Sequence, residues 1–235
     1  MKKKSPCFTG LRDKNPNIDF HGRGCLCIEY FSYLSNNNLM KFDVILAGVG
    51  GQGVLSIAYV IAQAAMVEGL EVRQSEVHGM AQRGGAVLAH LRIADKKIAG
   101  DLVPKGGADM IISMEPLESL RYISYLKTSG LVVTAAEPFK NIPDYPEIEK
   151  VHSMIKRLPK WRIVQAASLA KEAGLAKTVN TVMVGAASGF LPIKSHSLEA
   201  TIAGAFSKKD ASIALANTNA FKLGQDAVKE AKSGK

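Results

Sequence analysis

The chain has 235 residues, of which 47% are hydrophobic and 22% charged, so it can bury a sizeable core within a single domain. Its formal net charge is +9, but the positive residues are scattered rather than interleaved with aromatic residues in one stripe, which argues against nucleic-acid binding. The longest nearly uncharged stretch, residues 54–67, is too short and too rich in alanine to span a bilayer, so we expect no membrane segment.

The first 39 residues differ in composition from the rest of the chain. They contain all three cysteines, which are too few and too unevenly spaced for an iron–sulfur cluster, so we expect no metal site on this chain. Because the rest of the chain has no cysteine, we expect a cytoplasmic protein. The basic residues 2–4 are not followed by the apolar core of an export signal. We expect residues 1–39 to be a disordered or non-native extension, a native start at Met40, and a single domain over residues 40–235.

From Asp43 onward, the pattern of strand, glycine loop, helix and strand is typical of the start of a βαβ unit. Residues 44–47 form a continuous apolar run, as in a strand covered on both faces. Residues 54–68 predict a helix that is apolar nearly all round. We therefore expect the outer side of this helix to contact either another subunit or the C-terminal helices.

The rest of the chain alternates between short apolar runs and helical patterns. Strands are predicted at residues 70–73, 86–93, 110–114, 131–134 and 162–165, with a short return strand near Ile98 paired with the second of them. Helices are predicted at residues 117–126, 168–173, 181–190, 197–206 and 210–231, and a proline-rich loop at 135–146. This alternation predicts an α/β fold, a Rossmann-like sandwich with a mostly parallel sheet and a helical C-terminal region.

The segment Gly48-Val49-Gly50-Gly51-Gln52-Gly53 matches the pattern G-x-G-x-x-G between a strand and a helix, where that pattern has structural meaning. Glycines permit a tight turn and let backbone N–H groups approach a phosphate, while the helix N-terminus adds partial positive charge. The sequence therefore predicts cofactor binding by five residues: Gly48, Gly50, Gly51, Gln52 and Gly53. The alternative is that the glycines only let the helix and strand pack closely.

A dinucleotide-binding enzyme also needs an acidic residue about 20 positions further on to hold the ribose. Glu71 and Glu76 are the candidates. Glu71 falls at the start of the next predicted strand rather than at its end, and Glu76 falls in a predicted loop. NAD binding is therefore the less favoured interpretation of the glycine loop.

Residues 74–85 combine polar side chains and glycines between two predicted strands, and such a loop is costly to order unless it is used. Arg83 is suited to pair with a phosphate or carboxylate, and the adjacent Gly84 and Gly85 let the backbone approach a ligand. These three residues join the predicted cofactor-binding set. The remaining polar side chains of the loop are assigned to a substrate or interface role, although a lone histidine is more often structural: Glu76, His78 and Gln82.

The two glycine-rich segments together resemble the gamma domain of 2-oxoacid:ferredoxin oxidoreductases. The resemblance covers about residues 42–221 and includes Gly100-Asp101-Leu102-Val103-Pro104 and Asn180-Thr181. The ending Arg83-Gly84-Gly85 is similar to the superfamily as a whole, whereas the preceding His-Gly-Met-Ala-Gln resembles the indolepyruvate branch. The resemblance implies oxidative decarboxylation of an aryl pyruvate to an aryl-acetyl-CoA, with ferredoxin as the electron acceptor.

The residues limit what this chain can contribute to such a reaction. It lacks the Gly-Asp-Gly motif and following asparagine of a thiamine diphosphate site, and it lacks clustered cysteines. We therefore expect thiamine diphosphate, Mg and iron–sulfur clusters on a larger catalytic subunit, with CoA as co-substrate, and assign no catalytic residue here. The alternatives are a non-catalytic assembly subunit and a free-standing NAD- or flavin-dependent oxidoreductase.

Two later segments carry weaker signals. Asn180 and Thr181 precede an apolar helix, where capping of the helix is favoured over contact with a ligand. The run Gly185-Ala186-Ala187-Ser188-Gly189 gives that helix a face of small residues, which permits close packing against another helix.

Overall fold

A computed structural model describes residues 40–78, 84–140, 142–206 and 210–230. Its strands are β1 (Lys41–Val49), β2 (Glu71–His78), β3 (Ala86–Ala94), β4 (Ala108–Ser113), β5 (Leu126–Ala135) and β6 (Trp161–Val164). Its α-helices are α2 (Val54–Val67), α3 (Pro116–Arg121), α4 (Ile148–Lys156), α5 (Ala166–Glu172), α6 (Val179–Ser188), α7 (Ser195–Phe206) and α8 (Ala211–Glu230). Short 3₁₀ helices lie at Ile123–Tyr125 and Ala176–Thr178.

The strands form one sheet in the order β2-β3-β1-β4-β5-β6. The pairings β1–β4, β4–β5 and β5–β6 are parallel, whereas β3 runs antiparallel to both β1 and β2. The predicted α/β fold with a mostly parallel sheet and a helical C-terminal region is confirmed. The βαβ unit differs from the simplest form, because β3 lies between its two parallel strands, β1 and β2.

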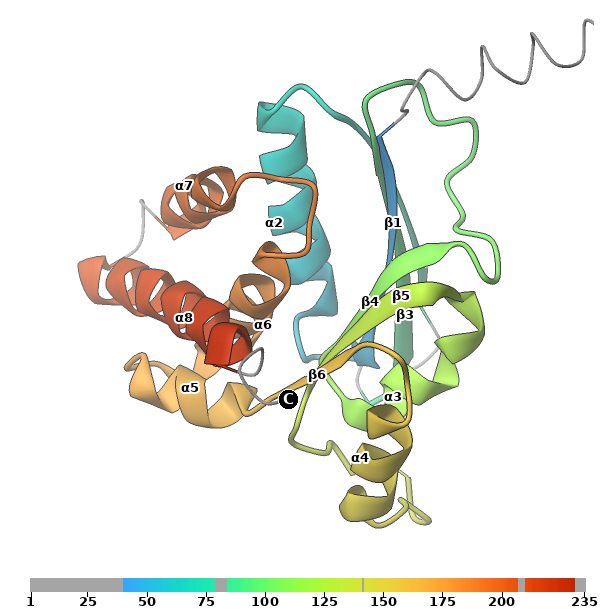
Figure 1. The fold of residues 1–235 in the computed structure, drawn as a ribbon. Coiled ribbons are helices and arrows are strands. Elements are labelled where there is room, and N and C mark those ends of the chain that lie inside the picture. Colours follow the sequence, from blue (N-terminus) through green and yellow to red (C-terminus); the bar gives the residue numbers. More distant parts are fainter. Residues whose placement is uncertain (1–39, 79–83, 141, 207–209, 231–235) are drawn as a thin grey trace, which may run out of the picture. The chain divides into compact units, whose positions relative to one another are not determined.

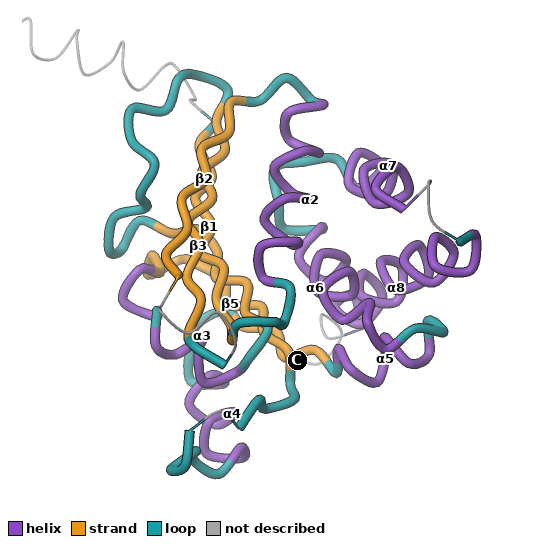
Figure 2. The backbone as a smooth tube through the Cα atoms, turned by 180° about the vertical axis from the view of Figure 1, so that it is seen from behind, coloured by secondary structure: helices purple, strands orange, loops and turns teal. Residues whose placement is uncertain are grey.

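Side chains of successive β1 residues enter two separate apolar clusters, as expected for a strand buried on both faces. Val44 and Leu46 belong to the cluster that includes residues of α2, α6 and α8, and Ile45 belongs to the cluster of α3 and α4. Figure 1 shows α2 and the C-terminal helices on one side of the sheet. Figure 2 shows from behind that α2 runs between the strands and α7.

The small-residue face predicted on α6 packs directly against α8. A Cβ atom added at Gly185 would lie 2.1 Å from the carbonyl oxygen of Phe221, and one added at Gly224 would lie 2.0 Å from that of Val182. The two helices therefore cross backbone to backbone, and the predicted close helix packing is confirmed.

Helix α2 has seven buried residues, consistent with its nearly uniform apolar character. It contacts α6 and α7, so the C-terminal helices cover much of its outer side, as one of the two sequence-based alternatives proposed. Tyr59, Met66 and Val67 stay exposed along it. Among the described helices, none has the length and apolar character needed to cross a membrane.

The predicted return strand near Ile98 is wrong. Strand β3 is paired on both sides, by β1 and β2, so it has no free edge for a third strand. Residues 95–107 instead form a loop held by side chains of β3. The guanidinium of Arg92 donates to the carbonyls of Gly100 (2.7 Å) and Leu102 (3.1 Å) and pairs with the buried Asp43.

Helix α4 was not predicted, and the helix predicted at 117–126 ends earlier, since Leu126 already begins β5. The remaining predicted helices and strands are found with shifted ends. The expected extension over residues 1–39 lies outside the described residues, so the proposed domain boundary at Met40 stays a prediction.

Candidate functional site

The glycine loop, residues 48–53, connects the carboxyl end of β1 to the first turn of α2. Gly51 and Gly53 have φ angles of 98° and 82°, in the left-handed region that favours glycine. Gly53 is the N-cap of α2, and its carbonyl oxygen accepts from the backbone N–H of Ser56 (3.0 Å). The loop therefore needs glycine for its turn and directs the N-terminus of α2 toward the end of the sheet.

The side chain of Gln52, predicted to bind a cofactor, turns toward the sheet. Its Oε1 atom accepts from the backbone N–H of Val49 (2.7 Å), and its Nε2 atom donates to the carbonyl of Met114 (3.3 Å). These bonds hold the glycine loop against the carboxyl end of β4. Gln52 thus has a structural task, and ligand contact by this side chain stays a prediction.

The second predicted segment reaches the same place. The backbone N–H of Gly50 donates to the carbonyl of Gly85 (2.8 Å), and that of Gly84 donates to the carbonyl of Gly50 (3.3 Å). The structure thus brings together two segments that are far apart in the sequence. The predicted residues Gln82 and Arg83 lie outside the described residues, so their roles stay predictions.

The sequence predicted a loop at residues 74–78, and this prediction is wrong. These residues form the second part of β2. Glu76 pairs with Ala89 and His78 with Val87 across the antiparallel β2–β3 ladder. Strand β2 is the edge of the sheet, where polar side chains can reach solvent, and this polarity led to the wrong assignment. The assignment of Glu76 and His78 to a substrate or interface role stays untested.

A cavity of about 560 Å³ opens beside the glycine loop. It lies at the carboxyl ends of β1, β4 and β5. The strands that follow β1 in the chain lie first on one side of it (β2 and β3) and then on the other (β4 to β6), so the strand order reverses at β1. Open α/β sheets bind ligands at such a position, called the topological switch point. The lining residues of this glycine-loop crevice are Gly51, Gln52, Gly53, Met114, Ala135, Glu137, Pro138, Phe139, Ala167, Ala176, Lys177, Val179 and Asn180.

Glu137 brings a carboxylate to the crevice that sequence reasoning missed. Its Oε1 atom accepts from the backbone N–H of Ala167 in the first turn of α5 (3.1 Å). Its Oε2 atom is buried without a hydrogen-bond partner among the described atoms. A buried carboxylate oxygen of this kind is suited to accept from a hydroxyl or amine of a ligand. The exposed Lys177 lines the same crevice and brings a positive charge.

The loop that carries Glu137 is anchored by another buried carboxylate, that of Glu115. Its Oε1 atom accepts from the hydroxyl of Tyr145 and from the backbone N–H of Phe139, and its Oε2 atom accepts from the backbone N–H of Glu118 (2.8 Å). Burial, followed by the bond to Glu115, raises the pKa of Tyr145. The crevice therefore has a fixed wall on the β5 side.

Asn180 does not cap α6, because the N-cap is Thr178, and the expected capping role is wrong. A Cβ atom added at Gly53 would meet the Asn180 amide nitrogen at 3.4 Å, so Asn180 stands against the glycine loop. The hydroxyl of Thr181 donates to Asn217 Oδ1 in α8 (2.7 Å). Neither contact could be predicted from local sequence patterns, because each joins segments that meet only in the fold.

Within the described ranges, no cluster of three or more His, Cys, Asp or Glu side chains forms a metal site. The arrangement instead offers backbone N–H groups, a helix N-terminus, one unpaired carboxylate oxygen and one exposed amine. These groups can bind an anionic or hydroxyl-bearing ligand, but they do not form a nucleophile–base pair.

Comparisons of the sequence with protein-family models and with known proteins point to the same family. The model of the family described as pyruvate ferredoxin/flavodoxin oxidoreductase matches residues 43–227. Indolepyruvate oxidoreductase subunit IorB of Pyrococcus horikoshii is 38% identical over 203 residues, covering 82% of this chain and 98% of its own. The corresponding subunit of Thermococcus kodakarensis is 37% identical over the same length.

Solved structures share the fold. The gamma subunit of a keto/oxoacid ferredoxin oxidoreductase from Geobacter sulfurreducens superposes with a TM-score of 0.60 at 20% identity, covering 80% of this chain and 99% of its own. A 2-oxoglutarate:ferredoxin oxidoreductase from Magnetococcus marinus, solved with 2-oxoglutarate, coenzyme A and succinyl-CoA bound, gives a TM-score of 0.65 at 21% identity. That match covers 81% of this chain and 31% of the Magnetococcus chain.

Proposed function

The chain belongs to the pyruvate ferredoxin/flavodoxin oxidoreductase family, and from this premise we propose that it is the small subunit of an indolepyruvate-type 2-oxoacid:ferredoxin oxidoreductase. The assembled enzyme oxidatively decarboxylates an aryl pyruvate to an aryl-acetyl-CoA and passes the electrons to ferredoxin. The names of relatives at 37–38% identity, matched over 98% of their length, support the indolepyruvate type.

The observation that carries the proposal is the hydrogen bonding of Gly50 to Gly84 and Gly85. These bonds join the end of the second segment, Gly84 and Gly85, to the glycine loop, and the glycine loop lines the crevice. Backbone N–H groups at the start of α2 suit a carboxylate or phosphate, and the unpaired Oε2 of Glu137 suits a hydroxyl. We propose that this crevice binds part of the 2-oxoacid or of CoA.

In this proposal the cofactors lie on the partner subunit. In the described part of the fold, no group of three or more His, Cys, Asp or Glu side chains could hold a metal ion. Thiamine diphosphate, Mg and iron–sulfur clusters would then lie on a larger catalytic subunit. The role left to this chain is to bind and orient a reactant and to complete the wall of the active site.

A free-standing dinucleotide enzyme is the weaker alternative. Because β3 separates β1 from β2, neither Glu71 nor Glu76 stands on a strand next to the glycine loop. Glu71 is also engaged by Arg73 at 3.2 Å. Neither of the two acidic residues that the sequence offers for the ribose contact of an NAD-binding fold therefore lies on a strand beside β1.

Reconstitution tests the proposal. Turnover of indolepyruvate, phenylpyruvate, pyruvate and 2-oxoglutarate is measured with CoA and ferredoxin, using the chain alone and the chain with its larger subunit. We expect no turnover by the chain alone, and in the complex a higher kcat/KM for the two aryl substrates. Turnover by the isolated chain would contradict the need for a partner, and a preference for pyruvate would contradict the indolepyruvate type.

A further inference from the structure

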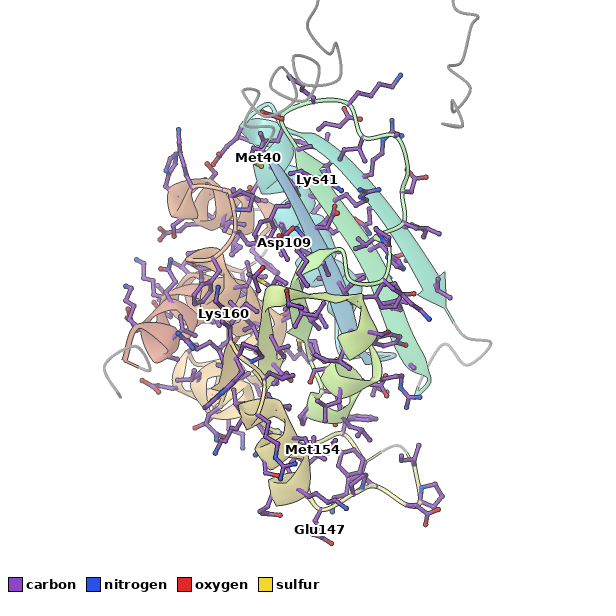
Figure 3. The ribbon with its side chains drawn as sticks, turned by 45° about the vertical axis from the view of Figure 1, so that its right-hand side comes forward. Met40, Lys41, Asp109, Glu147, Met154 and Lys160 are labelled. Carbon is purple, nitrogen blue, oxygen red and sulfur yellow. The ribbon has the colours of Figure 1, made fainter. Side chains whose placement is uncertain are left out.

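A second cavity, of about 760 Å³, lies at the opposite end of the sheet from the glycine-loop crevice. It is lined near the amino ends of the parallel strands β1, β4, β5 and β6, and by the end of α8. We call it the amino-end cavity. Figure 3 labels two of its lining residues, Asp109 and Lys160, along the border between the sheet and the C-terminal helices.

Arg162, in the second position of β6, lines this cavity and has one N–H group without a hydrogen-bond partner. Its Nη1 atom donates to the carbonyl of Trp161 (2.7 Å), and its guanidinium lies 5.7 Å from the ring centre of Phe190. Its Nε atom is buried and has no hydrogen-bond partner among the described atoms. A buried N–H without a partner is costly, so this donor points to a ligand that would satisfy it.

The geometry of the guanidinium selects the kind of anion. With Nη1 occupied by Trp161, the Nε–Nη2 edge is the one left for a ligand. Two parallel N–H donors on a planar edge match the two oxygens of a carboxylate. Lys160, which directly precedes β6, also lines the cavity and adds an exposed amine.

The one carboxylate in the lining does not cancel these charges. Asp109 already accepts from the Lys127 amine and from the backbone N–H of Asp43. Lys127 balances the charge of Asp109, so Lys160 and Arg162 leave the lining with a net positive charge. An anionic ligand is therefore favoured over a neutral or cationic one.

The remaining lining is apolar and partly aromatic. Phe42, Met110, Leu131, Phe190 and Val228 line the cavity, and all five belong to or pack on the apolar cluster beneath the C-terminal helices. Two of these side chains, Phe42 and Phe190, are aromatic, and aromatic side chains attract a ligand ring through offset or edge-on contacts.

We propose that the amino-end cavity is a binding site for a small carboxylate with an aromatic body, in which Arg162 holds the carboxylate edge-on. Lys160 strengthens the attraction, and the apolar residues enclose the ring. The site stands on the residues of this chain alone and does not depend on the reaction proposed above.

Isothermal titration calorimetry of the full chain tests this site with four probes: phenylacetate, acetate, phenylacetamide and inorganic phosphate. Phenylacetate should bind with a Kd at or below about 1 mM, and at least about tenfold more tightly than acetate, which lacks the ring, or phenylacetamide, which lacks the charge. Phosphate binding as tight as that of phenylacetate would overturn the proposal, because recognition would then rest on charge alone.

Variants test whether the guanidinium of Arg162 binds the carboxylate of phenylacetate. Arg162→Lys keeps the charge but not the planar edge, and should weaken phenylacetate binding at least about tenfold. Lys160→Met, at an exposed position that cannot disturb the core, should weaken it about threefold. Arg157→Lys, at the exposed C-cap of α4, is the matched control and should bind as wild type does. Unchanged affinity in both cavity variants, or absence of phenylacetate binding by the wild-type chain, would overturn the site.

Discussion

The glycines of the α6–α8 crossing and those of the glycine loop serve different ends. At the crossing, the Cβ that Gly185 lacks would lie 2.1 Å from a backbone carbonyl, so glycine is needed for space. In the loop, Gly51 has nothing within 4 Å of its missing Cβ, and glycine is needed for its φ of 98°. The first region holds the fold together, whereas the second shapes a turn beside an open crevice. Substitutions should therefore damage stability at the crossing and function at the loop.

The largest effect on stability is expected from Gly185→Ala. The methyl group must push apart two helix backbones, so the free energy of unfolding should fall by about 3 kcal/mol. Gly204→Ala in α7, where an added Cβ meets nothing within 4 Å, is the matched control and should change it by less than about 1 kcal/mol. Chemical denaturation of both variants measures the difference. Equal stability of the two would show that the helices separate easily.

A second pair of variants tests whether the glycine-loop crevice contributes to activity. Gly53→Ala and Gly69→Ala place a side chain at φ angles of 82° and 78°, so each should lose about 1–2 kcal/mol of stability. Only Gly53 borders the crevice and Asn180. In the assembled enzyme, Gly53→Ala should therefore also lower kcat/KM by about tenfold, which corresponds to about 1.4 kcal/mol. Equal kcat/KM for the two variants would show that the glycine loop does not contribute to the reaction.

Glu137→Gln tests the unpaired carboxylate oxygen. The amide keeps an oxygen for the Ala167 N–H, so the free energy of unfolding should change by less than about 1 kcal/mol. If Oε2 accepts from a reactant, KM for that reactant should rise severalfold while kcat changes less. Glu147→Gln, at an exposed position, serves as the control. A KM unchanged for both CoA and the oxoacid would exclude this contact.

The smallest effect concerns pH and lies away from the crevice. Burial, with the charge of Arg92 as the lesser cause, lowers the pKa of His90 below its ordinary value of 6.5, and its Nδ1 atom accepts from the backbone N–H of Val103. His90 binds a proton more readily in the unfolded chain than in the folded one. The stability that neutral His90 contributes is therefore fully present above pH 6.5 and is lost as the pH falls below that value. The slope is at most about 1.4 kcal/mol per pH unit.

Replacement of the titrating group checks this assignment. His90→Gln should flatten the pH dependence of the unfolding free energy below pH 6.5. The same slope in the variant and in the wild type would assign the pH dependence to other groups.

The buried strands and the two loop motifs could be predicted from the sequence, because each depends on local composition. Residues 44–47 are apolar throughout since both faces of β1 are covered, and the glycine pattern marks the turn that follows. Strand β2 was cut short because its polar half lies at an edge, which local composition does not distinguish from a loop.

The side chains of the crevice were missed for another reason. Glu137 follows β5 in a proline-rich loop, and Asn180 lies in the first turn of α6, where local patterns indicate a loop and a cap. Their place beside the glycine loop depends on the order of strands in the sheet. A single sequence carries no direct signal of that order.

Arg83→Ala in the assembled enzyme tests the central claim, that the two glycine-rich segments form a ligand-binding site of an oxidoreductase subunit. The activity is measured against the concentration of the larger subunit, with CoA and the aryl oxoacid each varied. At saturating partner, kcat/KM should stay lower by an amount equivalent to about 2–4 kcal/mol, and Arg83→Lys should restore it only in part. Full recovery of Arg83→Ala at high partner concentration would contradict the claim, because the arginine would then serve only to hold the subunits together.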